Sequence, residues 1–283
     1  MSNSKFDEDG FQIVKAKRIS KNKQTKIPPK SILLDKEDIV IDVQQFLKFK
    51  ISLDFSRIRT TVEDLRTSNY FEDFAKAVSK FLQDQETIEI ICFGLGHIAE
   101  CNISRYQLAL LLSLKDLCSP NEVFVHDPIF YKGECEVLKQ LGLQVILENN
   151  EGGYITSSKL TTIAYFPHCP KQLTNNFLWS NWDVKLQHCL LVCNSFNSIV
   201  DNNPSRILAE SVPYIHRIHP YTTELVLENN FKYTDIFNDT SLHSFPKEKL
   251  DLLESNFWLK GDKPTYENTE EFITSLMIEK LNI

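Results

Sequence analysis

The sequence predicts an α/β protein, a Rossmann-like three-layer sandwich built on a mostly parallel sheet. After residue 85, short runs of β-branched and other apolar residues alternate with stretches of helical spacing. Several of the short runs are apolar on both faces, which is typical of strands that helices cover on both sides of a parallel sheet. With 283 residues, of which 42% are hydrophobic, the chain can bury a sizeable core.

Residues 1–34 are predicted to form a disordered basic tail. Residues 1–30 carry eight Lys and Arg against three Asp and Glu, and they end in Pro28-Pro29. Such a segment buries too little apolar surface to fold by itself. It could bind nucleic acid or an import receptor, or remain only a solvated tail. Because the whole chain has a formal net charge of -7, the remaining residues are acidic, and we expect no direct nucleic-acid binding by them.

Residues 35–85 are predicted to form a helical extension that packs on the domain. Apolar side chains recur there at steps of three and four residues, which places them on one face of a helix. These residues are Tyr70, Phe71, Phe74, Val78, Phe81 and Leu82.

Residues 86–250 are predicted to form the α/β domain, and residues 251–283 a helical C-terminal tail. The expected strands are 88–93, 122–126, 144–147, 161–166 and 188–193, and the expected helices are 104–117, 134–141, 170–182 and 204–211. Ser104 and Gln107 have the spacing of a capping box, so the first of these helices is expected to begin near Ser104.

The cellular location follows from what the sequence lacks. No apolar stretch approaches the roughly 18 residues of a membrane helix, and the first residues, MSNSKFDEDG, have no signal-peptide pattern. Several of the seven cysteines lie inside apolar runs, which favours reduced thiols. We therefore predict an intracellular protein, cytoplasmic and with a nuclear location as a further option, that does not bind a membrane.

Residues 93–100 read FGLGHIAE, so Gly94 and Gly96 follow the first predicted strand, and Ala99 completes the spacing G-x-G-x-x-A. This spacing occurs in turns that hold a dinucleotide. A dinucleotide turn opens directly into a helix, however, and the helix predicted here begins well after Gly96. The alternative is a sharp bend after a buried strand.

Small, polar or ionisable residues follow the carboxyl ends of all five predicted strands, namely Gly94 and Gly96, Asp127, Glu148, His168 and Asn194. In an open parallel sheet, ligands bind at the carboxyl ends of the strands. We therefore predict a ligand pocket there. Asp127 is the candidate for a ribose hydroxyl, although it could instead cap a helix that begins near Phe130. The ligand-binding candidates are Gly94, Gly96, His97, Asp127, His168, Asn194 and Asp239.

Cys169 is the heme candidate, because Cys169-Pro170 resembles a Cys-Pro dipeptide whose thiolate can ligate heme. The alternative is a proline that starts the following helix. No CxxC or HExxH pattern occurs, so no metal site is predicted. No nucleophile elbow, P-loop or kinase motif occurs either, so no catalytic residue is assigned.

The polar segment DIFNDTSLHSFP, residues 235–246, is predicted to be a loop beside the strand ends that supplies Asp239 and His243 to the pocket. The alternative is an Asx turn at Asn238-Asp239 with His243 on the surface.

Taken together, several motifs resemble the sensitivity-to-red-light-reduced family. They are FGLGHI, SRYQLALLL, VHDPIF, LGLQVILENNEG, LWSNW, CNSF and DIFNDTSLHSFP. The resemblance covers about residues 86–246, and the helical segment before residue 86 lies outside it. The family is associated with circadian clock input and light signalling in plants, and with clock-gene expression and control of heme biosynthesis in animals. The resemblance implies no catalytic residues.

The resulting prediction is a regulatory protein in clock input and heme regulation, with protein partners and a small-ligand pocket at the strand ends. Heme or an adenine-containing molecule is the expected cofactor class. The rival hypothesis is a transferase that uses S-adenosylmethionine or a nucleotide on the turn GLGHIA. A third hypothesis is a pure interaction scaffold.

Overall fold

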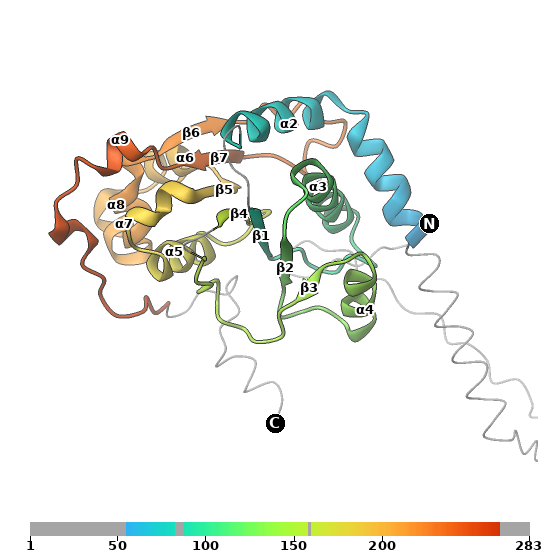
Figure 1. Cartoon of the computed structure of the whole chain (residues 1–283), viewed down its shortest axis with the longest axis horizontal. Coiled ribbons are helices and arrows are strands. Elements are labelled where there is room, and N and C mark those ends of the chain that lie inside the picture. Colours follow the sequence, from blue (N-terminus) through green and yellow to red (C-terminus); the bar gives the residue numbers. More distant parts are fainter. Residues whose placement is uncertain (1–54, 83–87, 158–159, 267–283) are drawn as a thin grey trace, which may run out of the picture. The chain divides into compact units, whose positions relative to one another are not determined.

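The computed structural model describes residues 55–82, 88–157 and 160–266 (Figure 1). All of them belong to the unit that spans Phe46–Ile283. The predicted basic tail 1–34, residues 35–54 of the predicted helical extension and residues 267–283 of the predicted C-terminal tail lie outside the described residues.

A seven-stranded sheet in the order β3-β2-β1-β4-β5-β7-β6 forms the centre of the fold. The first five strands in this order pair in parallel, whereas β7 is antiparallel to both β5 and β6. The predicted α/β class and the mostly parallel sheet are confirmed. The strands are β1 (Ile88–Phe93), β2 (Glu122–His126), β3 (Gln144–Val145), β4 (Thr161–Tyr165), β5 (Cys189–Asn194), β6 (Thr223–Val226) and β7 (Thr240–Ser244).

Helices lie against both faces of the sheet (Figure 1). Residues 55–66 are helical, and short 3-10 turns precede β5 and β6 and follow α9. The α-helices are α2 (Asn69–Phe81), α3 (Asn102–Cys118), α4 (Lys132–Gln140), α5 (Lys171–Ser180), α6 (Phe196–Asp201), α7 (Ser205–Ser211), α8 (Pro213–Ile218) and α9 (Lys247–Leu250). The 3-10 turns are Val184–His188, His219–Tyr221 and Ser255–Trp258.

The two faces of the sheet carry separate hydrophobic clusters. Apolar side chains of α2, α3 and α4 pack in one cluster, and those of α5, α7 and α8 pack in the other. All six residues of β1 are buried because helices cover this strand on both faces. The chain thus passes through α3 and α4 on one face of the sheet, and through α5 on the other face. The strand order therefore reverses between β1 and β4.

The start of α3 differs from the prediction. The helix begins at Asn102, its N-cap is Cys101, and no side chain caps it. The predicted capping box of Ser104 and Gln107 is therefore wrong, because both residues lie inside the helix and are buried. The Ser104 hydroxyl faces the turn after β1, where it lies 2.8 Å from the position that a Cβ on Gly96 would take.

The segment predicted as a loop at residues 235–246 contains β7, which pairs with β5 on one side and β6 on the other. His243 is therefore neither a pocket residue nor a surface residue, because its side chain is fully buried. The sequence TSLHS has no alternation of apolar and polar residues that would signal a strand.

Two further observations concern membrane-spanning helices and the state of the cysteines. Within the described residues, no helix combines the length and apolar character needed to cross a membrane. All seven cysteines are described, and each is a free thiol.

Helix α2 offers a direct test of the packing. Phe74 is fully buried on its inner face, while Ser79 is exposed. We expect Phe74→Ala to lower the free energy of unfolding by about 3–5 kcal/mol, because it leaves a cavity in the core. Urea denaturation measures this loss. Ser79→Ala is the control and should change the value by less than about 0.5 kcal/mol; equal small effects would mean that α2 does not pack on the domain.

Candidate functional site

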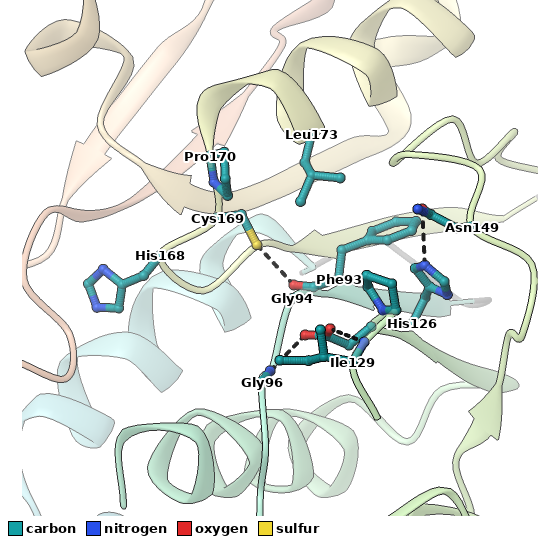
Figure 2. Close-up of a pocket in the computed structure, with 12 residues that line it drawn as sticks. Phe93, Gly94, Gly96, His126, Ile129, Asn149, His168, Cys169, Pro170 and Leu173 are labelled. Atoms are coloured by element: carbon teal, nitrogen blue, oxygen red, sulfur yellow. Dashed lines mark hydrogen bonds between the residues drawn. The ribbon is translucent and has the colours of Figure 1, made fainter. Parts of the chain in front are cut away.

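A cavity of about 220 Å³ lies at the carboxyl ends of β1, β2 and β4, where the strand order reverses (Figure 2). The cavity brings together five of the predicted residues, Gly94, Gly96, Asp127, His168 and Cys169. It is lined by Phe93, Gly94, Gly96, His126, Asp127, Pro128, Ile129, Asn149, His168, Cys169, Pro170 and Leu173.

The turn after β1 requires glycine at two positions for structural reasons. Gly94 and Gly96 have φ angles of +74° and +71°, in the left-handed region that side-chain-bearing residues rarely adopt. A Cβ on Gly94 would lie 2.4 Å from the Cys169 sulfur. Gly94 therefore brings the turn against the loop after β4, and Gly96 brings it against Ser104 of α3.

The Asp127 carboxylate joins the end of β2 to this turn. Its Oδ2 accepts a hydrogen bond from the Gly96 N–H (2.7 Å), and its Oδ1 accepts one from the Ile129 N–H (3.0 Å). The Gly94 N–H donates to the His126 carbonyl (3.0 Å). The N–H groups of both glycines thus point at the carboxyl end of β2. The predicted alternative, a helix cap by Asp127, is wrong because α4 begins at Lys132 and has Tyr131 as its N-cap.

His126 and Asn149 are lining residues that the sequence analysis missed. His126 is buried, and its Nδ1 carries the hydrogen because it lies 2.9 Å from the Ile146 carbonyl oxygen, which can only accept. Its Nε2 faces the Asn149 side-chain oxygen at 3.4 Å. The position of His126 at the end of β2, next to Asp127, was the only signal that could have identified it.

Cys169 lines the cavity, but its sulfur packs against the turn after β1. Its Sγ donates to the Phe93 carbonyl (3.1 Å), and its own carbonyl accepts from the Asn194 side-chain amide (3.2 Å). Burial raises the pKa of the Cys169 thiol, and the nearby Asp127 carboxylate raises it further. The thiolate that would bind a heme iron is therefore disfavoured in this arrangement.

His168 lines the cavity with its backbone, because its ring points away from the other lining side chains (Figure 2). The ring nitrogen Nε2 lies 2.6 Å from the Ile236 carbonyl oxygen and donates to it. His168 has a φ of 48°, so the loop after β4 turns sharply at this residue.

His97, Asn194 and Asp239 lie outside the lining. The His97 Nδ1 is 3.1 Å from a Glu134 carboxylate oxygen, and its ring stacks on Tyr131 at 4.1 Å between centroids. Buried Glu134 also accepts from the Ala99 N–H (2.9 Å), so it fixes the end of the glycine turn to α4. The Asp239 carboxylate accepts from the Ser198 hydroxyl (3.0 Å).

A second buried polar cluster lies at the start of α6 and was also missed. The Glu224 Oε2 accepts from the Asn197 N–H (2.9 Å), and the His243 Nε2 accepts from the Phe196 N–H (3.2 Å). Burial alone would raise the pKa of Glu224, but the neighbouring His243 ring and hydrogen bonds from Ser195 and the Asn197 N–H lower it to about 2. Nothing in the sequence near Glu224 marks it, since its partners are distant in the chain.

The described residues contain no group of three or more His, Cys, Asp or Glu side chains that could hold a metal ion. The cavity instead offers hydrogen-bond acceptors, above all the Asp127 carboxylate, between apolar walls.

Comparison with known proteins adds a family assignment. A family model described as the SRR1 domain matches residues 61–244. This match begins before residue 86, so it includes α2, which the sequence resemblance had left outside.

Three similar proteins are described by name. An SRR1-like protein of Mus musculus is 38% identical over 134 residues, which cover 46% of this chain and 53% of the mouse protein, about half its length. An SRR1-like protein of Drosophila melanogaster is 29% identical over 222 residues, 77% of this chain and 78% of the fly protein. Protein SENSITIVITY TO RED LIGHT REDUCED 1 of Arabidopsis thaliana is 24% identical over 226 residues, 74% of this chain and 78% of the plant protein.

The contact between Gly94 and Cys169 predicts an energetic coupling. Gly94→Ala should cost about 1–2 kcal/mol of stability for the left-handed backbone and about 1–3 kcal/mol for the clash with sulfur. In a Cys169→Ala background only the backbone cost remains, so Gly94→Ala should cost at least about 1 kcal/mol less. Cys135→Ala, on α4, is the control background. Urea denaturation of the wild type, the two single variants and the double variant measures the coupling free energy. A coupling free energy of zero would contradict the packing of the turn against Cys169.

The buried Glu224 carboxylate predicts a pH-dependent contribution to stability. Its pKa is lower in the folded chain, about 2, than the ordinary value of 4.5, so ionised Glu224 stabilises the fold above about pH 4.5. This contribution, up to about 3 kcal/mol, is lost as the pH falls toward 2. The stability difference between the wild type and Glu224→Gln should therefore shrink between pH 5 and pH 3. Exposed Glu228→Gln is the control, and a difference that does not vary with pH would refute the assignment.

Proposed function

The chain belongs to the SRR1 domain family, and from this premise we propose that it is a regulatory protein in clock input and heme regulation that responds to a small ligand. The family membership supports a regulatory role, and the plant relative is named for a reduced sensitivity to red light. Protein partners and action in the cytoplasm and nucleus are part of the same proposal.

The observation that carries the ligand-binding proposal is the cavity at the reversal of strand order between β1 and β4. Ligands of open α/β sheets bind at this point. The cavity has contributions from the ends of β1 and β2 and from the loop after β4, so a bound molecule would contact three segments that are distant in the sequence. Ligand occupancy could thereby change how these segments move, which is what a regulatory pocket requires.

The size of the cavity bears on the two proposed cofactor classes. A volume of about 220 Å³ is smaller than the roughly 300–1,000 Å³ of sites that enclose drug-sized ligands. A whole porphyrin would therefore not be enclosed, and Cys169 would have to leave its bond to the Phe93 carbonyl to ligate heme. An adenine-containing molecule that places only one part of its structure in the cavity fits better than heme.

A second candidate function is a transferase that uses S-adenosylmethionine or a nucleotide on the turn GLGHIA. The position of this turn favours it, because the turn borders the cavity at the reversal of strand order, where open α/β sheets bind nucleotides. This argument concerns topology alone, and one topology serves many functions.

Thermal-shift measurements on the full chain with NAD, S-adenosylmethionine and heme test the proposal. A ligand at 100 times its dissociation constant stabilises the fold by about 2.7 kcal/mol, which corresponds to a rise of roughly 5–10 °C in Tm for a domain of this size. We expect such a rise with S-adenosylmethionine and a smaller one in the Asp127→Asn variant. Asp262→Asn, an exposed residue outside the cavity, is the control.

The absence of a shift with all three compounds would contradict the ligand-responsive function. It would favour the scaffold hypothesis, under which Gly96→Ala and Asp127→Ala leave the regulatory function intact.

A further inference from the structure

We propose that the cavity, if it is the ligand pocket proposed above, binds an unphosphorylated nucleoside through the two vicinal hydroxyls of its ribose and selects against phosphate. The proposal rests on the donors and acceptors that the cavity presents, on its charge and on its size.

The first step concerns the Asp127 carboxylate. A carboxylate offers about four lone-pair positions on its two oxygens. The N–H groups of Gly96 and Ile129 occupy one position on each oxygen. One position on each oxygen therefore remains, on a group that lines the cavity. Two neighbouring hydroxyl donors of a ribose match two neighbouring acceptor oxygens that are already held in place.

The second step concerns phosphate. A phosphate-binding turn directs backbone N–H groups at the ligand, but here the Gly94 N–H donates to the His126 carbonyl and the Gly96 N–H to Asp127. No Lys or Arg is among the lining residues in the described part of the chain, and Asp127 is the only carboxylate there. A phosphate would therefore meet a negative charge without a compensating donor. The cavity favours a neutral or cationic ligand instead.

The third step concerns the rest of the nucleoside. Leu173 and Pro170 from the start of α5 and Ile129 from the turn after β2 form apolar walls (Figure 2). Such walls suit the faces of a purine ring, and the side chains of His126 and Asn149 make another side of the cavity polar. The volume of about 220 Å³ suits a nucleoside, and a second nucleotide would have to project out of the cavity.

Calorimetric titration of the full chain with adenosine, 2′-deoxyadenosine, AMP and NAD tests the inference. Adenosine should bind. The loss of one hydroxyl in 2′-deoxyadenosine removes a hydrogen bond to a charged group and should weaken binding at least about ten-fold. AMP and NAD should bind more weakly than adenosine.

Two variants locate the site. Asp127→Asn should weaken adenosine binding at least about ten-fold and should reduce the preference for adenosine over AMP, because it removes the charge. Since Asp127 also holds the glycine turn, Ile129→Trp provides a second test: Ile129 is 39% exposed, so the larger ring should block the cavity without disturbing the core. Asp262→Asn is the control and should bind adenosine as the wild type does.

The outcomes separate this inference from the proposed function. Equal binding of adenosine and 2′-deoxyadenosine, or tighter binding of AMP, would overturn the ribose assignment while a ligand pocket remained. Adenosine binding that Ile129→Trp leaves unchanged would overturn the placement in this cavity. If none of the four compounds binds but heme or another molecule stabilises the chain, the nucleoside class is wrong; if nothing stabilises it, the proposed function fails as well.

Discussion

The hydrogen bonds of the Asp127 carboxylate are the contacts on which the arrangement of the candidate site depends. They fix the end of β2 to the turn after β1, and they consume the glycine amide that would otherwise face a ligand. Because both oxygens are held by backbone N–H groups, the carboxylate is positioned before any ligand arrives. A single side chain thus determines both the shape of the turn and the electrostatic character of the cavity next to it.

The fold places this contact at the carboxyl ends of β1 and β2, beside the reversal of strand order. The helices that follow β1 and β2 cover one face of the sheet and the helix that follows β4 covers the other, so neighbouring loops diverge at the reversal of strand order. The glycine turn fills part of this space by packing against Cys169, and the remainder is the cavity. The conformations of Gly94 and Gly96 are therefore explained by local packing, and they are not by themselves evidence for a nucleotide.

The sequence predicted those parts of the fold that depend on local pattern. The bounds of β1 and β2 match the prediction because their apolar residues form continuous runs between turns. Strand β7 and the buried pair of Glu224 and His243 could not be predicted in this way, since β7 has no apolar run and the residues that these segments contact are far away in the chain. The start of α3 was placed too late because the Ser104 hydroxyl packs against the glycine turn instead of capping the helix.

The same reasoning applies to the site. The rule that ligands bind at the carboxyl ends of parallel strands identified Gly94, Gly96 and Asp127, whereas His126 and Asn149 needed the three-dimensional arrangement.

A crystal structure of the full chain with adenosine examines the Asp127 contact most directly. We expect electron density for a ribose whose 2′ and 3′ hydroxyls lie within about 3 Å of the Asp127 oxygens, with the Gly96 N–H still bonded to that carboxylate. A ribose bound elsewhere, or a Gly96 N–H that has turned toward the ligand, would contradict this interpretation.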